Sequence, residues 1–125
     1  MKITGKKFGR RGEEIARNYL IAKGYKIEAS NWRRSRFEID IVASKDNVLA
    51  FIEVKSSRAE VLGPPGLRVN KTKQKKIAEA ASEYLMELKT IPENLRFDVI
   101  SILMKPDKGP EVTHIESAYV LEQDL

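Results

Sequence analysis

Two neighbouring segments of the sequence restrict the fold more than any other feature. Phe37 to Ser44 and Val48 to Ser56 are rich in isoleucine, valine, phenylalanine and leucine, which favour β-strands. The intervening Lys45-Asp46-Asn47 has residue types that are common in hairpin turns. We therefore expect an antiparallel hairpin, and the rest of the chain has to pack around it.

Two amphipathic helices are predicted from apolar residues that recur every three to four positions. The first runs from about Lys7 to Lys23, and Gly24 ends it. The second begins near Asn70 or Thr72 and runs to about Leu88. The remaining segments predict a short strand (Tyr25 to Ser30), a basic loop (Asn31 to Arg36), a surface loop (Ser57 to Val69), a buried strand (Arg96 to Leu103) and a final edge strand (Val112 to Val120).

The order of these elements predicts the architecture. One helix and three strands are followed by a helix and two strands, and the second helix can serve as a right-handed crossover that makes the fourth strand parallel to the third. This order describes an α/β sandwich with a mixed central sheet flanked by helices. With 125 residues, of which 42% are hydrophobic, the chain has the size and apolar content of one domain over residues 1–125.

Charge and cysteine content narrow the classes of function. Lysine and arginine (23) exceed aspartate and glutamate (18), and the net charge of +5 favours polyanionic partners such as nucleic acid, although many proteins with this charge bind none. The absence of cysteine excludes disulfides, zinc–thiolate sites and thiol nucleophiles, and it suits a reducing compartment. The first residues lack an apolar signal core, and the longest aliphatic or aromatic run, Val48 to Ile52, is too short for a bilayer. We therefore expect a cytoplasmic protein that makes no membrane contact.

The predicted hairpin brings two carboxylates together. With Asp46 and Asn47 as the turn, or with a four-residue loop of the same register, Asp40 lies opposite Glu53. Their repulsion would be offset by magnesium or manganese, which take oxygen ligands and bridge carboxylates to phosphate oxygens. Lys55 shares a face with Glu53 and would orient an attacking water and stabilise charge on phosphoryl oxygens. The pattern predicts a metal-dependent centre for phosphodiester hydrolysis.

A third carboxylate is predicted on the first helix. Glu13 lies at the margin of the apolar stripe, where an unpartnered carboxylate is costly, whereas Glu14 lies on the solvent side. Glu13 is therefore a candidate for a further metal ligand or for a group that holds a metal-bound water. The plainer alternative is a solvated strand face on which Asp40 pairs with Lys55, and short motifs of this kind often occur by chance.

The motifs of the chain, taken together, resemble the YraN family of small endonuclease-like proteins. The resemblance rests on Gly12-Glu13, Ala16, Tyr19-Leu20, Gly24-Tyr25, Asn31, Glu38-Ile39-Asp40, Phe51-Ile52-Glu53-Val54-Lys55, Lys73, Arg96-Phe97-Asp98-Val99 and His114. It implies a restriction-endonuclease-like sandwich with a PD-(D/E)xK site, similar to archaeal Holliday junction resolvases. It also implies a nucleic-acid substrate and a magnesium-dependent cut, with active-site positions that match Glu13, Asp40, Glu53 and Lys55.

Two positions depart from the family pattern. This chain has Phe37 where the family usually has glycine before the Glu-Ile-Asp run. It has Ser57, followed by Arg58, where the family usually has arginine two residues after the motif lysine. Both positions lie near the expected docking place of a backbone phosphate, so they bear on substrate geometry more than on the metal site.

Basic residues supply the candidates for nucleic-acid binding. Trp32 is flanked by Arg33, Arg34 and Arg36, a combination that could stack on and neutralise nucleic acid or simply anchor a loop with a solvated rim. Lys73, near the positive end of the second helix, is a candidate phosphate contact.

Two further polar residues are expected to be structural, and three classes of function stay open. His114 lies in the final strand pattern, and Asp98 is expected to be a buried carboxylate paired with Arg96. The leading class is a structure-selective DNA endonuclease of repair or recombination, as a homodimer where the substrate is symmetric. The others are a nucleic-acid-binding module without efficient catalysis and a structural domain.

Overall fold

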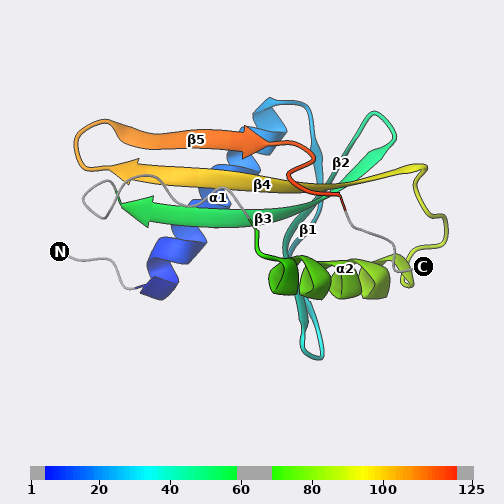
Figure 1. The fold of residues 1–125 in the computed structure, drawn as a ribbon. Coiled ribbons are helices and arrows are strands. Elements are labelled where there is room, and N and C mark those ends of the chain that lie inside the picture. Colours follow the sequence, from blue (N-terminus) through cyan, green and yellow to red (C-terminus); the bar gives the residue numbers. More distant parts are fainter. Residues whose placement is uncertain (1–4, 59–68, 121–125) are drawn as a thin grey trace.

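The computed structural model describes residues 5–58 and 69–120, which form helices and strands in the predicted order. The elements are α1 (Gly5–Ala22), β1 (Lys26–Arg34), β2 (Phe37–Lys45), β3 (Val48–Arg58), α2 (Lys71–Leu85), β4 (Asn94–Lys105) and β5 (Gly109–Ile115) (Figure 1). Neither of these helices combines the length and the apolar character that crossing a membrane requires.

The strands form one mixed sheet in the order β1-β2-β3-β4-β5. The pairs β1–β2, β2–β3 and β4–β5 are antiparallel, whereas β3 and β4 are parallel. Two parallel strands need a long connection from the end of one to the start of the other, and α2 is part of the connection from β3 to β4. The predicted mixed sheet flanked by helices is confirmed.

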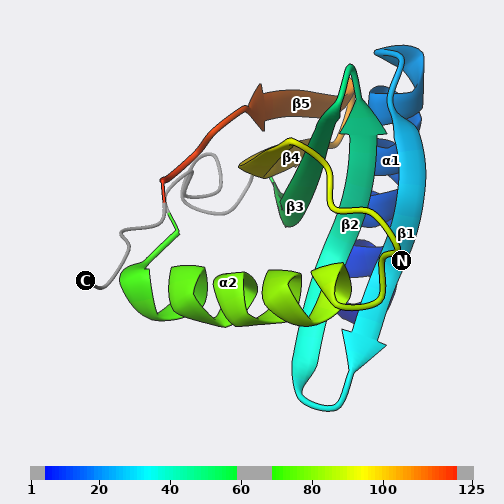
Figure 2. The ribbon, with the colours of Figure 1, turned by 90° about the vertical axis from the view of Figure 1, so that its right-hand side faces the viewer.

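The two helices cover opposite faces of the sheet (Figures 1 and 2). Residues of β3 alternate between the faces, so that Ala50 and Ile52 pack toward α1 while Leu49 and Phe51 pack toward α2. The α1 side of the core also contains Ala16, Leu20, Ile41, Ala43, Ile100 and Ile102, and the α2 side contains Val42, Ala80, Ala81 and Tyr84. Burial of each large apolar side chain contributes about 1.5–3 kcal/mol, so both helices are held by their apolar stripes.

Local backbone signals fix the ends of the elements as the sequence predicts. Asp46 and Asn47 have φ values of 49° and 64°, which is the geometry of a two-residue type I′ turn. Gly24 has φ 93° and follows α1, where the N–H of Tyr25 donates to the carbonyl of Leu20. The hairpin register, from Lys45–Val48 to Ile41–Ile52, is the predicted one.

One predicted boundary near the basic residues is wrong. Asn31 to Arg36 was expected to be a loop, but β1 continues to Arg34 because residues 32–34 pair with residues 37–39 of β2. The turn is confined to Ser35 and Arg36. A strand with exposed basic side chains resembles a loop in composition, and only the ladder to β2 distinguishes the two.

Other boundaries differ by a few residues. The last strand is β5, Gly109–Ile115, rather than Val112 to Val120, because Ser117 adopts φ 50° and its N–H donates to the carboxylate of Asp98. Helix α2 ends at Leu85 instead of Leu88. The surface loop expected from Ser57 to Val69 begins later, since β3 continues to Arg58, and residues 59–68 of it lie outside the described residues.

Candidate active site

Asp40 lies where β2 and β3 separate. It is the next residue after the last ladder pair, Ile41–Ile52, and its Oδ2 accepts a hydrogen bond of 2.8 Å from the backbone N–H of Val54. The carboxylate thus gives Val54 an acceptor at the point where the ladder ends. Strict alternation also ends here, because Ile39 packs with the α2-side core although it was expected on the face of Ile41.

Glu13 reaches this region because α1 approaches β3 closely at Gly12. A Cβ atom at Gly12 would overlap the hydroxyl of Ser56, so no larger residue fits without a shift. Glu13 follows directly on the helix and is half-buried. Its Oε2 is buried without a hydrogen-bond partner among the described residues. A buried carboxylate oxygen in this state is costly unless a cation or donor joins it.

Glu53 lies on β3 and lines a small cavity together with Asp40. Its side chain is 8% exposed, and its Oε1 lies 2.5 Å from the Nζ of Lys73. Lys73 is in the first turn of α2, which the side chain of Asn70 caps by accepting the N–H of Lys73. The second oxygen of Glu53, Oε2, is buried and lacks a partner within the part of the chain that the structure describes.

The charges of Glu13 and Glu53 act on the pKa of Asp40. The pKa of Asp40 is raised to about 6, chiefly by burial and further by the charges of Glu13 and Glu53; the hydrogen bond from Val54 and the charge of Lys73 oppose the rise. The pKa of Lys73 is raised, because the effect of its hydrogen bond to Glu53 is larger than the opposing effect of burial. The cluster therefore carries negative charge that Lys73 offsets only in part.

The donor chemistry of this cluster fits a hard divalent cation. A cavity of about 30 Å³ is lined by Asp40 and Glu53, together with Glu38, Ile39, Ile52 and Ile77, and has room for a water-sized particle. Carboxylate oxygens are the ligands that magnesium and manganese prefer. Among the described residues, however, no three acidic or histidine side chains lie close enough to one another to bind one metal ion.

Lys55, the fourth predicted active-site residue, is half-buried on β3 two positions beyond Glu53. Alternation along the strand gives the two side chains the same face. The backbone of Lys55 is level with Ser101 of the parallel strand β4. The fold thus brings Asp40, Glu53 and Lys55 to adjacent positions on β2 and β3, with Glu13 added from α1.

The basic residues predicted to bind nucleic acid lie along the β1–β2 hairpin and α2. Arg33 pairs with Glu38 at 3.4 Å, and Arg34 pairs with Glu87 at 3.4 Å. Such exposed pairs contribute little stability and exchange readily with other anions. Arg36 is the third arginine predicted to bind nucleic acid, and its guanidinium lies 4.9 Å from the ring centroid of Phe37.

Trp32 packs against α2. Its ring meets that of Tyr84 edge-on at 5.6 Å, and its Nε1 donates to Glu87 at 3.4 Å. Of the two roles left open for Trp32, an anchor of the hairpin is the one that these contacts support.

Sequence reasoning missed two neighbours of the carboxylates. Lys73 was expected to contact phosphate, and nothing in its sequence context indicates that it pairs with Glu53. Tyr119 was assigned to the final strand, but it stacks on Phe97 at 5.4 Å. Burial raises the pKa of Tyr119, and the charges of Glu53 and Asp98 add to the effect, so its hydroxyl lies within the influence of both carboxylates.

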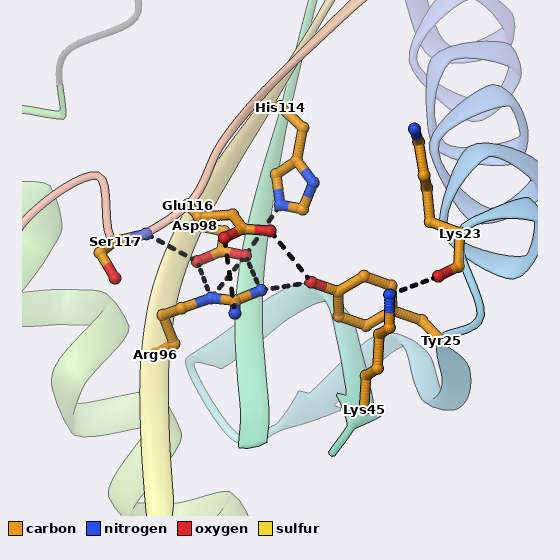
Figure 3. Close-up of polar contacts among 8 residues, drawn as sticks. All are labelled: Lys23, Tyr25, Lys45, Arg96, Asp98, His114, Glu116 and Ser117. Carbon is orange, nitrogen blue, oxygen red and sulfur yellow. Dashed lines mark hydrogen bonds and ion pairs between the residues drawn. The ribbon is translucent and has the colours of Figure 1, made fainter. Parts of the chain in front are cut away.

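Asp98 forms a second buried carboxylate centre, and here the predicted pairing with Arg96 is confirmed (Figure 3). The Nε of Arg96 donates to Oδ1 at 2.9 Å, and Nη2 donates to Oδ2 at 2.9 Å. His114 Nε2 lies 2.8 Å from Oδ2, and the N–H of Ser117 donates to Oδ1 at 3.0 Å. Burial raises the pKa of Asp98, but the hydrogen bonds of His114, Arg96 and Ser117 outweigh it, and the net pKa is lowered. His114 is a buried structural residue, as expected.

Fold and site together define a small α/β protein with a mixed five-stranded sheet and an acidic cluster at the fork between two strands. The model of "Uncharacterised protein family UPF0102" matches residues 12–102. The UPF0102 protein of Geotalea uraniireducens is 38% identical over 96% of this chain and 94% of its own length. That of Chlorobaculum tepidum is 42% identical over 90% of this chain and 92% of its own. The chain belongs to the UPF0102 family, the YraN family that its motifs resemble.

Proposed function

We propose that this protein is a metal-dependent endonuclease that hydrolyses phosphodiester bonds of DNA. The observation that carries the proposal is the pair of buried carboxylate oxygens, Glu13 Oε2 and Glu53 Oε2, that lack partners among the described residues while both carboxylates act electrostatically on Asp40. A fold built only for stability pairs its buried carboxylates, whereas a centre that receives a cation keeps oxygens available. The resemblance of Asp40, Glu53 and Lys55 to a PD-(D/E)xK motif supports the same assignment.

Each residue has a distinct proposed role. Asp40 and Glu53 would hold magnesium or manganese, and Glu13 would add a ligand or hold a water. The cation would supply positive charge to the phosphoryl oxygens and activate a water for attack. Lys55 orients that water and stabilises the negative charge that grows on the phosphate in the transition state. Lys73 pairs with Glu53, and with a cation at Glu53 it would be available to a DNA phosphate.

The direct test is cleavage by the purified protein of duplex, single-stranded, flapped and four-way DNA in manganese. Asp40→Asn should abolish cutting. Asp46→Asn is the matched control, because Asp46 is an exposed turn residue on the same hairpin, and asparagine also suits its positive φ. Cleavage that survives Asp40→Asn, or a wild type that cuts none of the four substrates, would contradict the proposal.

A second candidate is a DNA-binding module without catalysis. It is favoured by one observation, the ammonium of Lys73 on Glu53, which places a built-in cation where a metal ligand is needed. In that case DNA binding would fall as salt rises, no cation would be bound at the carboxylates, and no strand would be cut.

A further inference from the structure

A second cavity opens beside the carboxylates, between the start of β2 and the first half of α2. Its volume is about 290 Å³, and it is lined by Arg36, Phe37, Glu38, Lys76, Ile77 and Glu79. Glu38 and Ile77 also line the small cavity at Asp40 and Glu53, so the two cavities adjoin. This volume is at the lower end of the range of about 300–1,000 Å³ that small-molecule pockets span, which suits one planar group and no duplex.

The chemistry of the lining suits a nucleobase better than a phosphate. Phe37 supplies a half-buried ring and Arg36 a planar guanidinium, and bases stack on both kinds of surface. Two cations, Arg36 and Lys76, are balanced by two carboxylates, Glu38 and Glu79. A phosphate inside would meet both carboxylates, whereas the amino group of a base can donate to one of them.

We propose that this cavity receives one unpaired base of the DNA strand whose backbone passes the carboxylate cluster. The inference rests on the proposed function and deepens it, because it makes DNA with an unpaired nucleotide beside the cut the preferred substrate. The base lies against Phe37 and Ile77, Glu79 accepts from its amino group, and Lys76 meets its phosphate. Fully paired DNA cannot fill the cavity unless a base leaves the stack, which costs a few kcal/mol.

The experiment measures equilibrium binding in EDTA by fluorescence anisotropy, so that neither a metal nor cleavage enters the result. Three duplexes of one sequence are compared: fully paired, with one bulged cytosine, and with an abasic bulge. The wild type should bind the cytosine bulge about 10-fold more tightly than the abasic bulge, because stacking of one base is worth about 1–3 kcal/mol. Equal affinities for the two bulges, including no binding to either, would overturn the proposal.

Two exposed neighbouring lysines give matched variants. Lys76→Glu and Lys75→Glu change the net charge equally, but only Lys76 lines the cavity. Lys76→Glu should weaken binding of the cytosine bulge about 10-fold beyond the effect of Lys75→Glu, and equal effects would overturn the assignment. Ile77→Trp fills the cavity and, with a melting temperature near that of the wild type, should remove the preference for cytosine over the abasic bulge. A preference that survives this filled cavity also counts against the proposal.

The outcomes separate the cavity from the cutting centre. A protein that prefers the cytosine bulge in EDTA but cuts no DNA in manganese supports the cavity and contradicts the nuclease. Manganese-dependent cutting without any preference for the bulged base supports the nuclease and overturns the cavity.

Discussion

Asp98 on β4 is buried and Asp40 on β2 of the same sheet is half-buried, yet their surroundings are opposite. Both oxygens of Asp98 accept hydrogen bonds, from Arg96, His114 and Ser117, and its pKa is lowered. Among the described residues, Asp40 accepts one hydrogen bond, from Val54; the charges of Glu13 and Glu53 act on it, and its pKa is raised to about 6. The difference distinguishes a carboxylate that holds the fold together from one whose pKa the surroundings raise, and it supports the proposed cation site at Asp40.

The network around Asp98 connects several segments of the fold. It joins β4 to β5 through His114 and to the segment after β5 through Ser117, whose neighbour Ala118 donates its N–H to the carbonyl of Phe97. Tyr25, just after α1, accepts from Arg96 (Figure 3). The acidic cluster, in contrast, lies at the place where two strands part. The polar groups around Asp98 are satisfied, whereas Glu13 and Glu53 in the acidic cluster each keep one buried oxygen without a partner among the described residues.

The largest expected effect is on Asp98. Asp98→Asn replaces an ionised acceptor by an amide whose NH₂ group meets donors, and it leaves Arg96 without its counter-charge. Breaking such a buried pair costs about 3–5 kcal/mol, so the free energy of unfolding should fall by that amount. Urea denaturation at pH 7 in EDTA measures it. A loss below about 1 kcal/mol would show that this network does not hold the fold together.

The same substitution at Asp40 should act in the opposite direction. An aspartate with a folded pKa of about 6, against an ordinary 3.8, binds its proton more tightly in the folded state, so it costs stability as the pH rises through 6. One pKa unit corresponds to about 1.4 kcal/mol, and Asp40→Asn should stabilise the metal-free protein at pH 7 by up to about 3 kcal/mol.

The pH dependence sharpens this comparison. The gain of Asp40→Asn should vanish below about pH 4, where Asp40 is protonated in both states of the wild type. Asp98, with its lowered pKa, contributes stability that is present above the ordinary value of 3.8 and is lost as the pH falls through its folded pKa. Urea denaturation in EDTA between pH 3 and pH 7 checks both signs. A stabilisation by Asp40→Asn that does not change with pH would contradict the electrostatic explanation.

Lys55 distinguishes a cutting centre from a cluster that only binds a cation. Lys55→Ala should reduce single-turnover cleavage about 100-fold, equivalent to about 2.7 kcal/mol, because it removes charge that acts in the transition state. DNA binding in calcium should change little, and Lys55→Arg should not restore the rate, since a planar guanidinium differs in shape from an ammonium. If binding falls in step with cleavage, Lys55 anchors a phosphate instead.

A smaller effect is expected at Lys73. Lys73→Met removes the ammonium that competes with a cation for Glu53, so manganese should bind about 10-fold more tightly, which corresponds to about 1.4 kcal/mol. The metal-free protein should melt at a lower temperature, since a buried carboxylate loses its partner. Lys71→Met, on the same exposed first turn, is the control for the change in net charge. Unchanged manganese affinity in Lys73→Met would show that Glu53 is not a ligand.

The fold could be predicted where local signals are strong. The Asp46-Asn47 turn set the register of the hairpin as far as Ile41–Ile52, because side chains repeat with a period of two. The predicted pair of Asp40 with Glu53 lies beyond the end of this ladder. The separation of β2 from β3 beyond the pair Ile41–Ile52 could not be predicted, because no residue type is specific to the end of a ladder. The partners of Asp98 and Glu53 come from distant parts of the chain, and Lys73 and Ser117 carry no local sign of these contacts.

The boundaries that were wrong have a common cause. Residues 31–34 are polar enough for a loop, and the segment after Ile115 is apolar enough for a strand, but tertiary contacts reverse both expectations. In the first case the ladder to β2 extends the strand. In the second the hydrogen bond from Ser117 to Asp98 turns the chain away from the sheet.

Calorimetric titration of manganese into the protein tests most directly whether the carboxylates at the strand fork form a cation site. The wild type and Asp46→Asn should bind manganese with equal affinity, and Asp40→Asn should lose the binding while keeping its fold. A wild type that binds no manganese at millimolar concentration, or an Asp40→Asn variant that binds it as well as the wild type does, would contradict the account.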